Sequence, residues 1–308
     1  MDIRQLRYFL AVAEERSFSR AAKRLHVAQP ALSLHVRKME EVFGTPLLIR
    51  GASGATPTEA GVILMRRARS VISDFDHMTE DMCQLGREPS GIVRIGLPGT
   101  ISGILSVPLI AAIHEQYPQI KLIIAEAMSG FVGEWLDDGR ADLGVLYGDT
   151  GSKQIALQPL IEEELVLLQP PGSTPNAKVD AELLTSLSLI LPSGTHGLRR
   201  TISDLLLAAG TIIEPTIEID SYTSIKRLVS DGYGCSVLPS HTVGDEAANG
   251  ALVVTPFSGR RLWRQVYLAT PTNRTASRAT TVVTELLSDT VRNLLASQTW
   301  HGTRKFKL

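Results

Sequence analysis

Polar and cationic side chains recur at helical spacing near the N-terminus. Gln29, Ser33 and Arg37 are each four residues apart, so a helix places them on one side. The adjoining face of that helix carries Pro30, Leu34 and Lys38. Short polar groups with a cation suit contacts to base edges in the major groove of DNA. The spacing predicts a DNA-reading helix, and the alternative is a solvated amphipathic face.

Two residues just upstream suit contacts to the DNA backbone. Ser17 and Arg20 lie at the start of the preceding predicted helix, where phosphate is readily bound. Charge is also uneven along the chain. Residues 1–58 carry nine Lys/Arg and five Asp/Glu, net +4, whereas the remainder carries 22 and 27, net −5. A basic head on an acidic body favours nucleic acid as the partner of the head.

A second group of candidate binding residues lies where predicted strands end or helices begin. These residues are Thr100, Ser129, Tyr147, Thr195, His196, Leu198, Ser221 and Tyr222. Helix N-termini that face a cleft bind anions, so this group predicts a small-molecule site. Serine and threonine before helices also cap them, and the two roles can coexist.

The sequence gives little support for catalysis, a cofactor or a metal site. The run Gly234-Cys235-Ser236 is no GxSxG elbow, because Leu238 stands where the last glycine belongs. The seven histidines form no metal-binding motif, and Cys83 and Cys235 match no zinc or CxxC spacing. Cys235 is expected in the core rather than as a redox sensor. The acidic runs 137–138 and 162–164 are expected to be solvated or to cap helices.

Length and composition set the scale of the fold. A chain of 308 residues predicts two or more domains. Hydrophobic residues at 44% and charged residues at 20% exclude a mainly disordered chain. No apolar run approaches 18 residues and the N-terminus lacks a secretory pattern, so we expect a cytoplasmic protein without a membrane span.

Three helices are expected in the first 43 residues, followed by a two-strand or extended segment at 45–58. The first helix buries Leu6, Phe9, Leu10 and Ala13, and Ser17 caps the second. The third has Pro30 in its first turn, ends at Gly44, and is expected to bury Leu32, Val36, Met39 and Phe43. A helix, a short break and a helix is the layout of a helix-turn-helix.

A long helix follows, capped by Thr58. Its apolar residues are spaced alternately four and three apart, which is a heptad seam typical of a helix that pairs with a partner helix. The seam consists of Leu64, Ala68, Val71, Phe75, Met78, Met82 and Leu85. A helix buried in a globular core shows such a stripe over two turns only, so three heptads favour dimerisation.

The body alternates strand and helix, which predicts largely parallel, helix-covered sheets in two lobes. The expected strands are 92–97, 120–126, 142–147, 164–168, 188–191, 216–219, 235–238, 252–255 and 264–269. The expected helices end near 117 and 139 and otherwise span 197–209, 222–231, 240–247 and 276–297. The tail 300–308 is expected to be frayed.

Motifs in the head resemble those of LysR-type transcriptional regulators. The matching segments are SFSRAA at 17–22, LHVAQPALS at 25–33, PLLIR at 46–50 and TEAG at 58–61. The order of strands and helices in the body fits the same family, and several body segments are most similar to the nitrogen-assimilation-control branch. Some of that branch works without a small effector.

The resemblance implies an α/β protein with a winged helix-turn-helix at 1–58, a linker and dimerisation helix at 59–87, and an effector domain at 91–308 that resembles periplasmic binding proteins. Lobe I would be about 91–160 plus 267–297, and lobe II about 161–266. Gln29, Pro30, Ser33 and Arg37 would approach bases and Arg50 would bind phosphate. Leu34 departs from the polar residue frequent in the family and can touch only a thymine methyl.

The function expected from the resemblance is regulation of transcription by a homodimer or homotetramer on an interrupted inverted repeat of double-stranded DNA. A small molecule such as a carboxylate would bind between the lobes, and RNA polymerase would be a further partner. Two alternatives stay open. One is a regulator without an effector, controlled by its abundance. The other is a solute-binding or enzymatic α/β protein whose helical head only dimerises.

Overall fold

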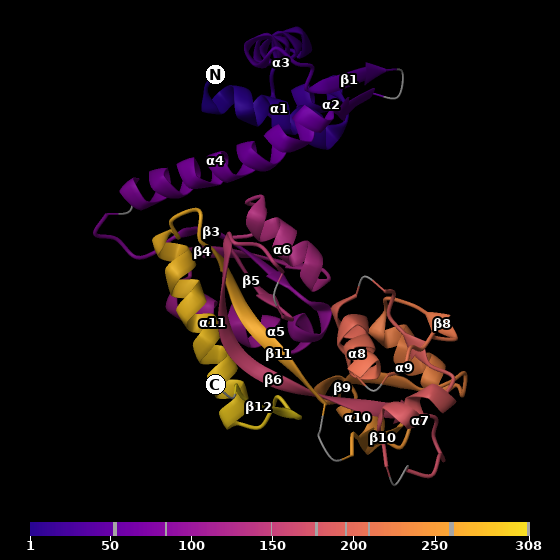
Figure 1. Cartoon of the computed structure of the whole chain (residues 1–308). Coiled ribbons are helices and arrows are strands. Elements are labelled where there is room, and N and C mark those ends of the chain that lie inside the picture. Colours follow the sequence, from indigo (N-terminus) through magenta and orange to yellow (C-terminus); the bar gives the residue numbers. More distant parts are fainter. Residues whose placement is uncertain are drawn as a thin grey trace.

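A computed structural model describes residues 1–51, 54–83, 85–148, 150–175, 178–194, 196–208, 210–258 and 262–306. The head contains three helices followed by a two-stranded wing (Figure 1). Its elements are α1 (Ile3–Glu15), α2 (Phe18–Leu25), α3 (Gln29–Phe43), β1 (Leu48–Gly51) and β2 (Gly54–Pro57). Asp2 and Gln5 form a capping box at the start of α1, and Ser17 caps α2. Gly44 ends α3 with a φ of +64°, a conformation that glycine adopts without strain.

One apolar cluster holds the three helices and the wing together. Phe9, Leu32 and Met39 are its large fully buried members from α1 and α3. The expected burial of Phe43 is wrong, because this side chain is 43% exposed at the end of α3. The helix ends there at Gly44, and Leu47 and Leu48 at the start of the wing join the core of the head, whereas Phe43 does not.

The linker helix α4 (Glu59–Cys83) divides its heptad seam between two environments. Thr58 accepts a hydrogen bond from the Gly61 amide at 3.0 Å and so caps the helix. Leu64 and Ala68 pack into the core of the head. The rest of the seam is exposed, with exposed fractions of 42–69%, and comprises Val71, Phe75, Met78, Met82 and Leu85. The expected extension of the helix through Leu85 is wrong, because α4 ends at Cys83.

Lobe I lies beneath the linker helix. Its elements are β3 (Gly91–Leu97), α5 (Gly99–Gln116), β4 (Ile120–Glu126), α6 (Ser129–Asp137), β5 (Leu143–Leu146) and α11 (Arg278–Ala296). Strands β4, β3 and β5 are parallel neighbours, while α5 and α11 pack together against the sheet. The core of this lobe includes Leu97, Leu105 and Leu143.

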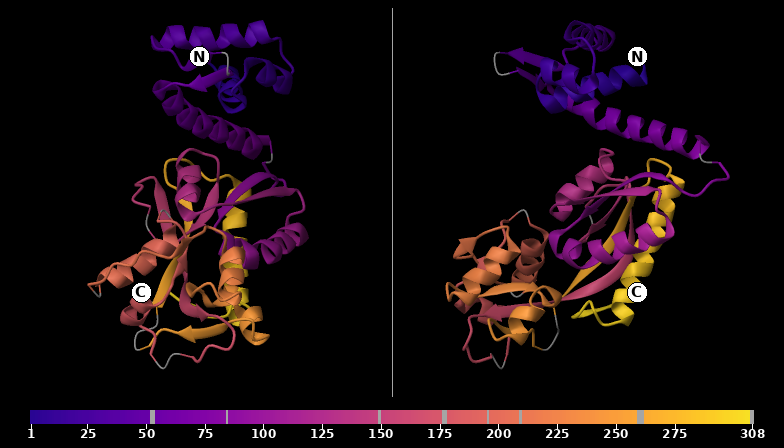
Figure 2. Two further views of the ribbon diagram at one scale, coloured as in Figure 1. Left: turned by 90° about the vertical axis from the view of Figure 1, so that its right-hand side faces the viewer. Right: turned by 180° about the vertical axis from the view of Figure 1, so that it is seen from behind.

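Lobe II is smaller and is built from short elements. They are α7 (Ala181–Ser186), β7 (Ile190–Leu191), α8 (Gly197–Ala208), β8 (Ile217–Glu218), α9 (Tyr222–Ser230), β9 (Ser236–Pro239), the 3₁₀ turn η1 (Ser240–Thr242), α10 (Gly244–Ala248) and β10 (Val253–Pro256). Two long strands, β6 (Ile155–Gln169) and β11 (Leu262–Pro271), run through both lobes as an antiparallel pair (Figure 2).

The long strands overturn the expectation of largely parallel sheets. Strand β11 lies antiparallel to β5, and β6 lies antiparallel to β9, β10 and β11. Parallel pairing is confined to β3 with β4 and β5, and to β7 with β8, among the named strands. The chain crosses between the lobes twice in opposite directions, so the crossing strands must be antiparallel to each other.

The expectation of a frayed tail is also wrong. Trp300 is 2% exposed in the core of lobe I, and β12 (Thr303–Lys305) pairs with β6 at Ile161–Glu163. The Gly302 carbonyl accepts a hydrogen bond from the Glu164 amide at 2.7 Å. Residues 300–305, here called the C-terminal strap, therefore cover β6 where it passes between the lobes.

Candidate functional site

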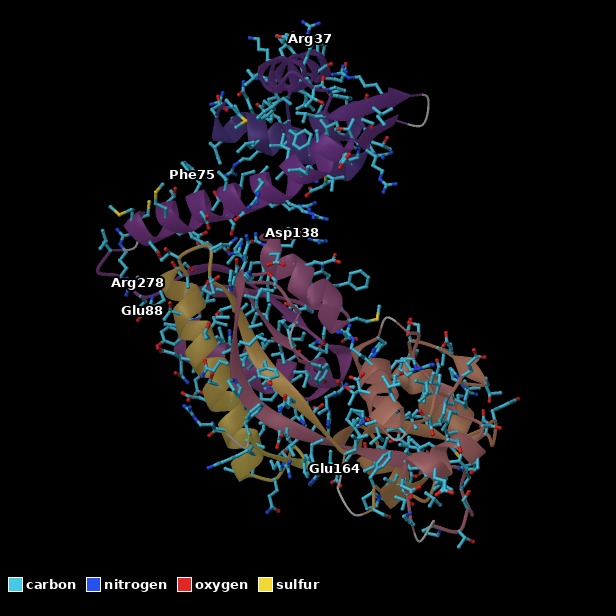
Figure 3. All side chains as sticks on the ribbon, viewed as in Figure 1. Arg37, Phe75, Glu88, Asp138, Glu164 and Arg278 are labelled. Atoms are coloured by element: carbon cyan, nitrogen blue, oxygen red, sulfur yellow. The ribbon has the colours of Figure 1, made fainter. Side chains whose placement is uncertain are left out.

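The outer face of α3 carries the side chains predicted to read DNA. Gln29, Pro30, Arg37 and Lys38 are exposed, and Leu34 is 41% exposed. Arg37 lies at the end of the molecule remote from the body (Figure 3). Its guanidinium is 3.7 Å from the Glu41 carboxylate, an exposed pair that water screens strongly. The face is therefore free to enter a groove.

Arg50 ties the wing to this helix. Its guanidinium donates to the Ser33 hydroxyl at 3.0 Å, lies 3.4 Å from the Glu40 carboxylate, and stacks over the Phe18 ring at 4.8 Å. The Glu40 carboxylate also accepts from the Leu47 amide at 2.9 Å. Arg50 therefore holds the wing against α3. Its side chain remains 44% exposed, so it can also make the predicted contact with phosphate.

The structure places Ser17 and Arg20 together at the start of α2. The Ser17 hydroxyl accepts from the Arg20 amide at 3.3 Å. The Arg20 guanidinium contacts the Glu15 carbonyl and lies 3.7 Å from the Glu15 carboxylate, yet its side chain is 66% exposed. Both residues have local structural roles beside the predicted backbone contact.

A cavity of about 930 Å³, here called the interlobe cavity, lies between the lobes. The first residues of α6 and α8 line it, including Ser129, Gly130 and Gly197, so two helix N-termini face it. Its cationic lining residues are Arg200, Arg264 and Arg304. Its acidic lining residues are Glu134, Asp137, Glu162 and Asp204.

The predicted effector residues separate into several groups. Ser129 and Tyr147 line the interlobe cavity, and the Ser129 hydroxyl accepts from the Tyr147 amide at 3.3 Å. Thr100 does not line the cavity, but its hydroxyl is 2.5 Å from the Tyr147 hydroxyl. His196 and Tyr222 are joined at 3.4 Å between the imidazole Nε2 and the phenol oxygen.

Two of the remaining predicted effector residues, Leu198 and Ser221, have structural roles. Leu198 is fully buried in the core of lobe II and does not line the cavity. Ser221 caps α9 by accepting from the Ser224 amide at 3.3 Å. Thr195 lies outside the described residues.

A buried ionic cluster forms the floor of the cavity where the crossing strands pair. Arg264 of β11 and Glu163 of β6 are register partners joined at 2.8 Å, and both are almost fully buried. The Arg264 guanidinium stacks over the Tyr147 ring at 3.4 Å. His241 contributes Nδ1 at 3.5 Å from the Glu163 carboxylate and Nε2 at 3.2 Å from the Thr100 carbonyl. The cluster thus joins residues of both lobes.

Burial sets the protonation of the neutral groups around this cluster. It lowers the pKa of His241 and of His196 below the ordinary histidine value, more than Glu163 and Asp220 raise them. Burial likewise raises the pKa of Tyr147, so its hydroxyl stays neutral. Neutral hydrogen-bonding groups therefore surround the ion pair of Arg264 and Glu163.

Sequence reasoning missed this cluster. Residues 162–164 were expected to be solvated or capping, but all three carboxylate residues are at least 94% buried. Glu162 pairs with Arg304 at 2.6 Å and Glu163 with Arg264. Charged residues between apolar ones at 160–168 and 262–269 were the available signal, because a charge on a strand buried on both faces needs a partner.

A metal site and a reactive cysteine are the other chemistries to consider. The residues that the structure describes contain no group of three or more His, Cys, Asp or Glu side chains placed to bind a metal ion. Cys235 is buried in lobe II, and burial raises the pKa of its thiol. No described helix is long and apolar enough to cross a membrane.

Comparisons with known proteins agree with this architecture. Residues 3–62 match the model of the bacterial regulatory helix-turn-helix protein, lysR family, and residues 86–292 match the LysR substrate binding domain. The nitrogen assimilation regulatory protein nac of Klebsiella aerogenes is 31% identical over 261 residues, which are 83% of this chain and 85% of that protein. The DNA-binding transcriptional dual regulator OxyR of Escherichia coli K12 is 30% identical over 259 residues, with coverages of 83% and 85%.

Among solved structures, full-length OxyR from Pseudomonas aeruginosa superposes with a TM-score of 0.78 at 28% identity, covering 100% of this chain and 99% of that one. Full-length BenM gives a TM-score of 0.56 at 25% identity, with coverages of 98% and 99%. The two family models together span most of the chain. The chain therefore belongs to the LysR family and is a LysR-type transcriptional regulator, with a helix-turn-helix domain followed by an effector-binding domain.

Proposed function

We propose that the outer face of α3 reads base edges in the major groove, with Arg37 as its principal side chain. Gln29, Ser33 and Arg37 project from one side of a helix whose opposite side is buried in the head. Ser17 and Arg20 then contact backbone phosphate from the start of α2, and Arg50 does so from the wing. The solvent exposure of Arg37 on this face is the observation that carries the proposal.

The regulator acts as a dimer in this proposal, through the exposed stripe of α4. Four apolar side chains of α4 at heptad spacing, from Val71 to Met82, and Leu85 just beyond the helix are 42–69% exposed in the single chain. Phe75 in the middle of the stripe faces away from the body (Figure 3). A second copy of α4 would bury them, and two heads so joined would bind two half-sites of an interrupted inverted repeat. Such a protein acts in the cytoplasm, where its DNA is.

The domain boundaries of this proposal are supported by the separate cores. The head with its wing takes residues 1–58, the linker with α4 takes 59–87, and the effector domain takes 91–308. Within the effector domain the lobe I core contains Ile161 and Val266, whereas the lobe II core begins at Leu165. The strands therefore pass from one lobe to the other near residues 161–165 and 262–266, and the C-terminal strap belongs to lobe I.

The effector of this proposal is a small carboxylate bound in the interlobe cavity. The N-termini of α6 and α8 face the cavity, and Arg200 and Arg264 line it. Within the described residues, Nε and Nη1 of Arg264 are buried without a hydrogen-bond partner. A carboxylate that reached them would form charge-assisted hydrogen bonds with the guanidinium.

Selection of binding sites from a random duplex DNA pool tests the DNA-reading face. The full-length protein should enrich an interrupted inverted repeat, and Arg37→Ala should weaken binding to it by about 1–3 kcal/mol while relaxing one position. Arg292→Ala, an exposed arginine change on α11, is the matched control and should bind as the wild type does. A uniform loss on all DNA would assign Arg37 to phosphate instead, and no enrichment at low salt would refute the proposal.

Thermal unfolding with a library of small carboxylates tests the effector. A ligand at 100 times its dissociation constant stabilises the folded protein by about 2.7 kcal/mol, which raises the unfolding temperature measurably. Arg200→Ala should reduce that shift. A library that never changes the unfolding temperature would favour a regulator controlled by its abundance.

A further inference from the structure

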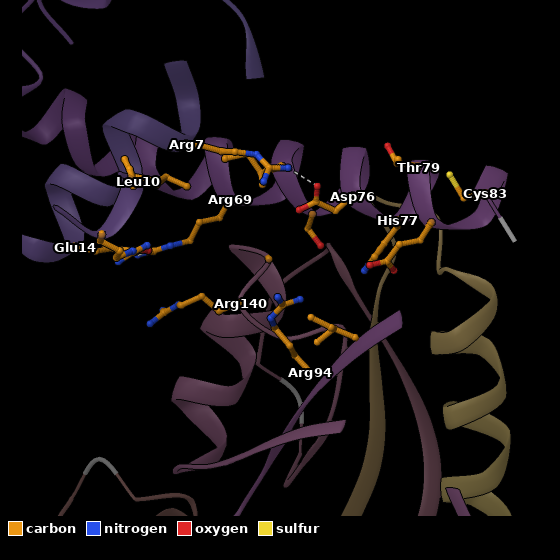
Figure 4. A pocket seen from close by; sticks show the side chains of 17 residues that line it. Arg7, Leu10, Glu14, Arg69, Asp76, His77, Thr79, Cys83, Arg94 and Arg140 are labelled. Atoms are coloured by element: carbon orange, nitrogen blue, oxygen red, sulfur yellow. Dashed lines mark hydrogen bonds and ion pairs between the residues drawn. The ribbon is translucent and has the colours of Figure 1, made fainter. Parts of the chain in front are cut away.

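The linker helix rests on lobe I through two buried carboxylates. Asp138 lies 3.7 Å from the Arg69 guanidinium, and Asp142 lies 3.6 Å from Nε2 of His77. The side chains of Asp138 and Asp142 are only 8% and 1% exposed, so α4 covers them. Asp142 also accepts from the Arg94 amide at 2.8 Å, which fixes it to β3. Figure 4 shows Arg69 and His77 on the side of α4 that faces lobe I.

Between these carboxylates the backbone of lobe I touches the helix directly. Gly139 has a φ of +76°, and a Cβ built on it would lie 3.0 Å from the backbone nitrogen and Cα of Ser70. The same Cβ would lie 2.8 Å from Nη1 of Arg274. A side chain at this position would therefore separate α4 from lobe I. Residues 138, 139 and 142 with Arg69, Ser70 and His77 are here called the linker contact.

The elements that lead to the linker contact begin in the interlobe cavity. Helix α6 lines the cavity from Ser129 to Asp137, and Asp137 directly precedes Asp138. Strand β5 is preceded by Asp142 and followed by Tyr147, which also lines the cavity. Both elements are short, roughly 13–14 Å, and every residue of β5 is buried. Packed elements of this kind move as rigid units, so displacement at one end reaches the other.

We propose that Asp138, Gly139 and Asp142 are positioning residues that couple the interlobe cavity to the linker helix. A ligand that shifts Ser129 or Tyr147 changes how well lobe I fits α4, because α6 and β5 each reach from the cavity to the linker contact. The orientation of α4 sets the placement of the head, since Leu64 and Ala68 are part of the core of the head. The proposal rests on the cavity being the effector site proposed above.

Hydrogen–deuterium exchange of the full-length protein tests the coupling without an identified effector. Gly139→Ala places a methyl group against Ser70 and should raise the exchange rates of amides 72–81 of α4. The expected increase is about 5- to 150-fold, the usual range of coupling between sites. Gly250→Ala is the matched control, because Gly250 has a similar φ of +74° but open space around it. It should leave those amides unchanged.

A double-variant comparison tests the connection to the cavity. Tyr147→Phe removes the hydroxyl that contacts Thr100 and should change the exchange of amides 72–81 by itself. In the Gly139→Ala background the same substitution should add nothing, because the linker contact is already open. An effect of Tyr147→Phe that is equal in both backgrounds, or absent from both, would overturn the coupling.

A second variant covers the case in which Gly139→Ala does not fold. Asp142→Asn removes the charge that faces His77, and its amide oxygen can still accept from the Arg94 amide. It should raise the exchange of amides 72–81 as well, and unchanged exchange would refute the linker contact. Failure of the wild-type protein to select DNA or bind a carboxylate would refute the proposed function alone, because the exchange measurements require neither ligand.

Discussion

The two contacts that join the parts of this regulator are built differently. Two paired strands and the C-terminal strap cross the junction between the lobes, and its central charges, Arg264 and Glu163, are paired at 2.8 Å. The linker contact is crossed only by the segment that follows α4. Both places contain buried polar atoms that, among the described residues, lack a hydrogen-bond partner. At and beside the linker contact they are Ser73 Oγ, Asp74 Oδ1, both ring nitrogens of His77 and Asp142 Oδ1, and at the junction they include Arg264 Nε and Nη1, Glu163 Oε1 and His241 Nδ1.

The difference indicates distinct mechanical roles. Continuous strands with a paired buried charge favour one arrangement, because separating Arg264 from Glu163 would leave two uncompensated charges. No described strand continues across the linker contact, and its ion pairs at 3.6 and 3.7 Å are longer than the 2.8 Å pair of the junction, which lowers the cost of separation. We expect the junction to act as a hinge that stays assembled and the linker contact to be the joint that opens.

The largest effect is expected at the junction. Arg264→Met should lower the free energy of unfolding by about 3–5 kcal/mol, because Glu163 would remain buried without its partner. Urea unfolding of the full-length protein measures this loss. Arg304→Met, which breaks the more exposed pair with Glu162, serves as the control and should cost less. Equal losses would show that burial does not distinguish the two pairs.

Acid should destabilise the junction next. Burial holds the pKa of His196 and His241 below the ordinary histidine value, so the unfolded chain takes up their protons first. Their contribution to stability is complete above about pH 6.5 and is lost as the pH falls through the lowered values. Thermal unfolding from pH 8 to pH 5 checks this. His241→Asn should flatten the profile, whereas His301→Asn, at an exposed position, should not.

The acidic groups of the linker helix should respond in the opposite direction. Burial raises the pKa of Asp74 and Glu80, despite opposing effects of Arg274 and His77. Their contribution is complete below the ordinary carboxyl range of about 4–4.5 and is lost as the pH rises through the raised values. Asp74→Asn and Glu80→Gln should therefore stabilise the protein at pH 7. Unfolding temperatures that stay unchanged or fall would contradict this expectation.

The smallest effect is expected from Arg69 at the linker contact. Its pair with Glu14 at 3.2 Å is partly open to water, and Asp138, 3.7 Å away, keeps its closer pair with Arg140 at 2.8 Å. Arg69→Gln should cost no more than about 1 kcal/mol of unfolding free energy, as is usual for screened pairs. A loss comparable to that of Arg264→Met in the same urea titration would mean that the linker contact is as rigid as the junction.

Local signals predicted the head well. The Ser17 cap, Pro30 in the first turn of α3 and the Gly44 terminus act within a few residues, and the structure confirms each of them. The heptad seam was read correctly as a pattern, but its first residues belong to the core of the head. Spacing alone does not indicate which neighbour covers a stripe, so the division at Val71 required the folded chain.

The sequence by itself determined the family, the helix-turn-helix and the alternation of strands and helices in the body, because motifs, caps and periodicity depend on near neighbours. Only the tertiary structure decided which charges are buried. Glu163 and Arg264 are 101 positions apart, and the antiparallel register of β6 and β11 brings them together. It also decided that the tail containing Trp300 is ordered, because the pairing of β12 with β6 and the contact with His241 arise only once both lobes have formed.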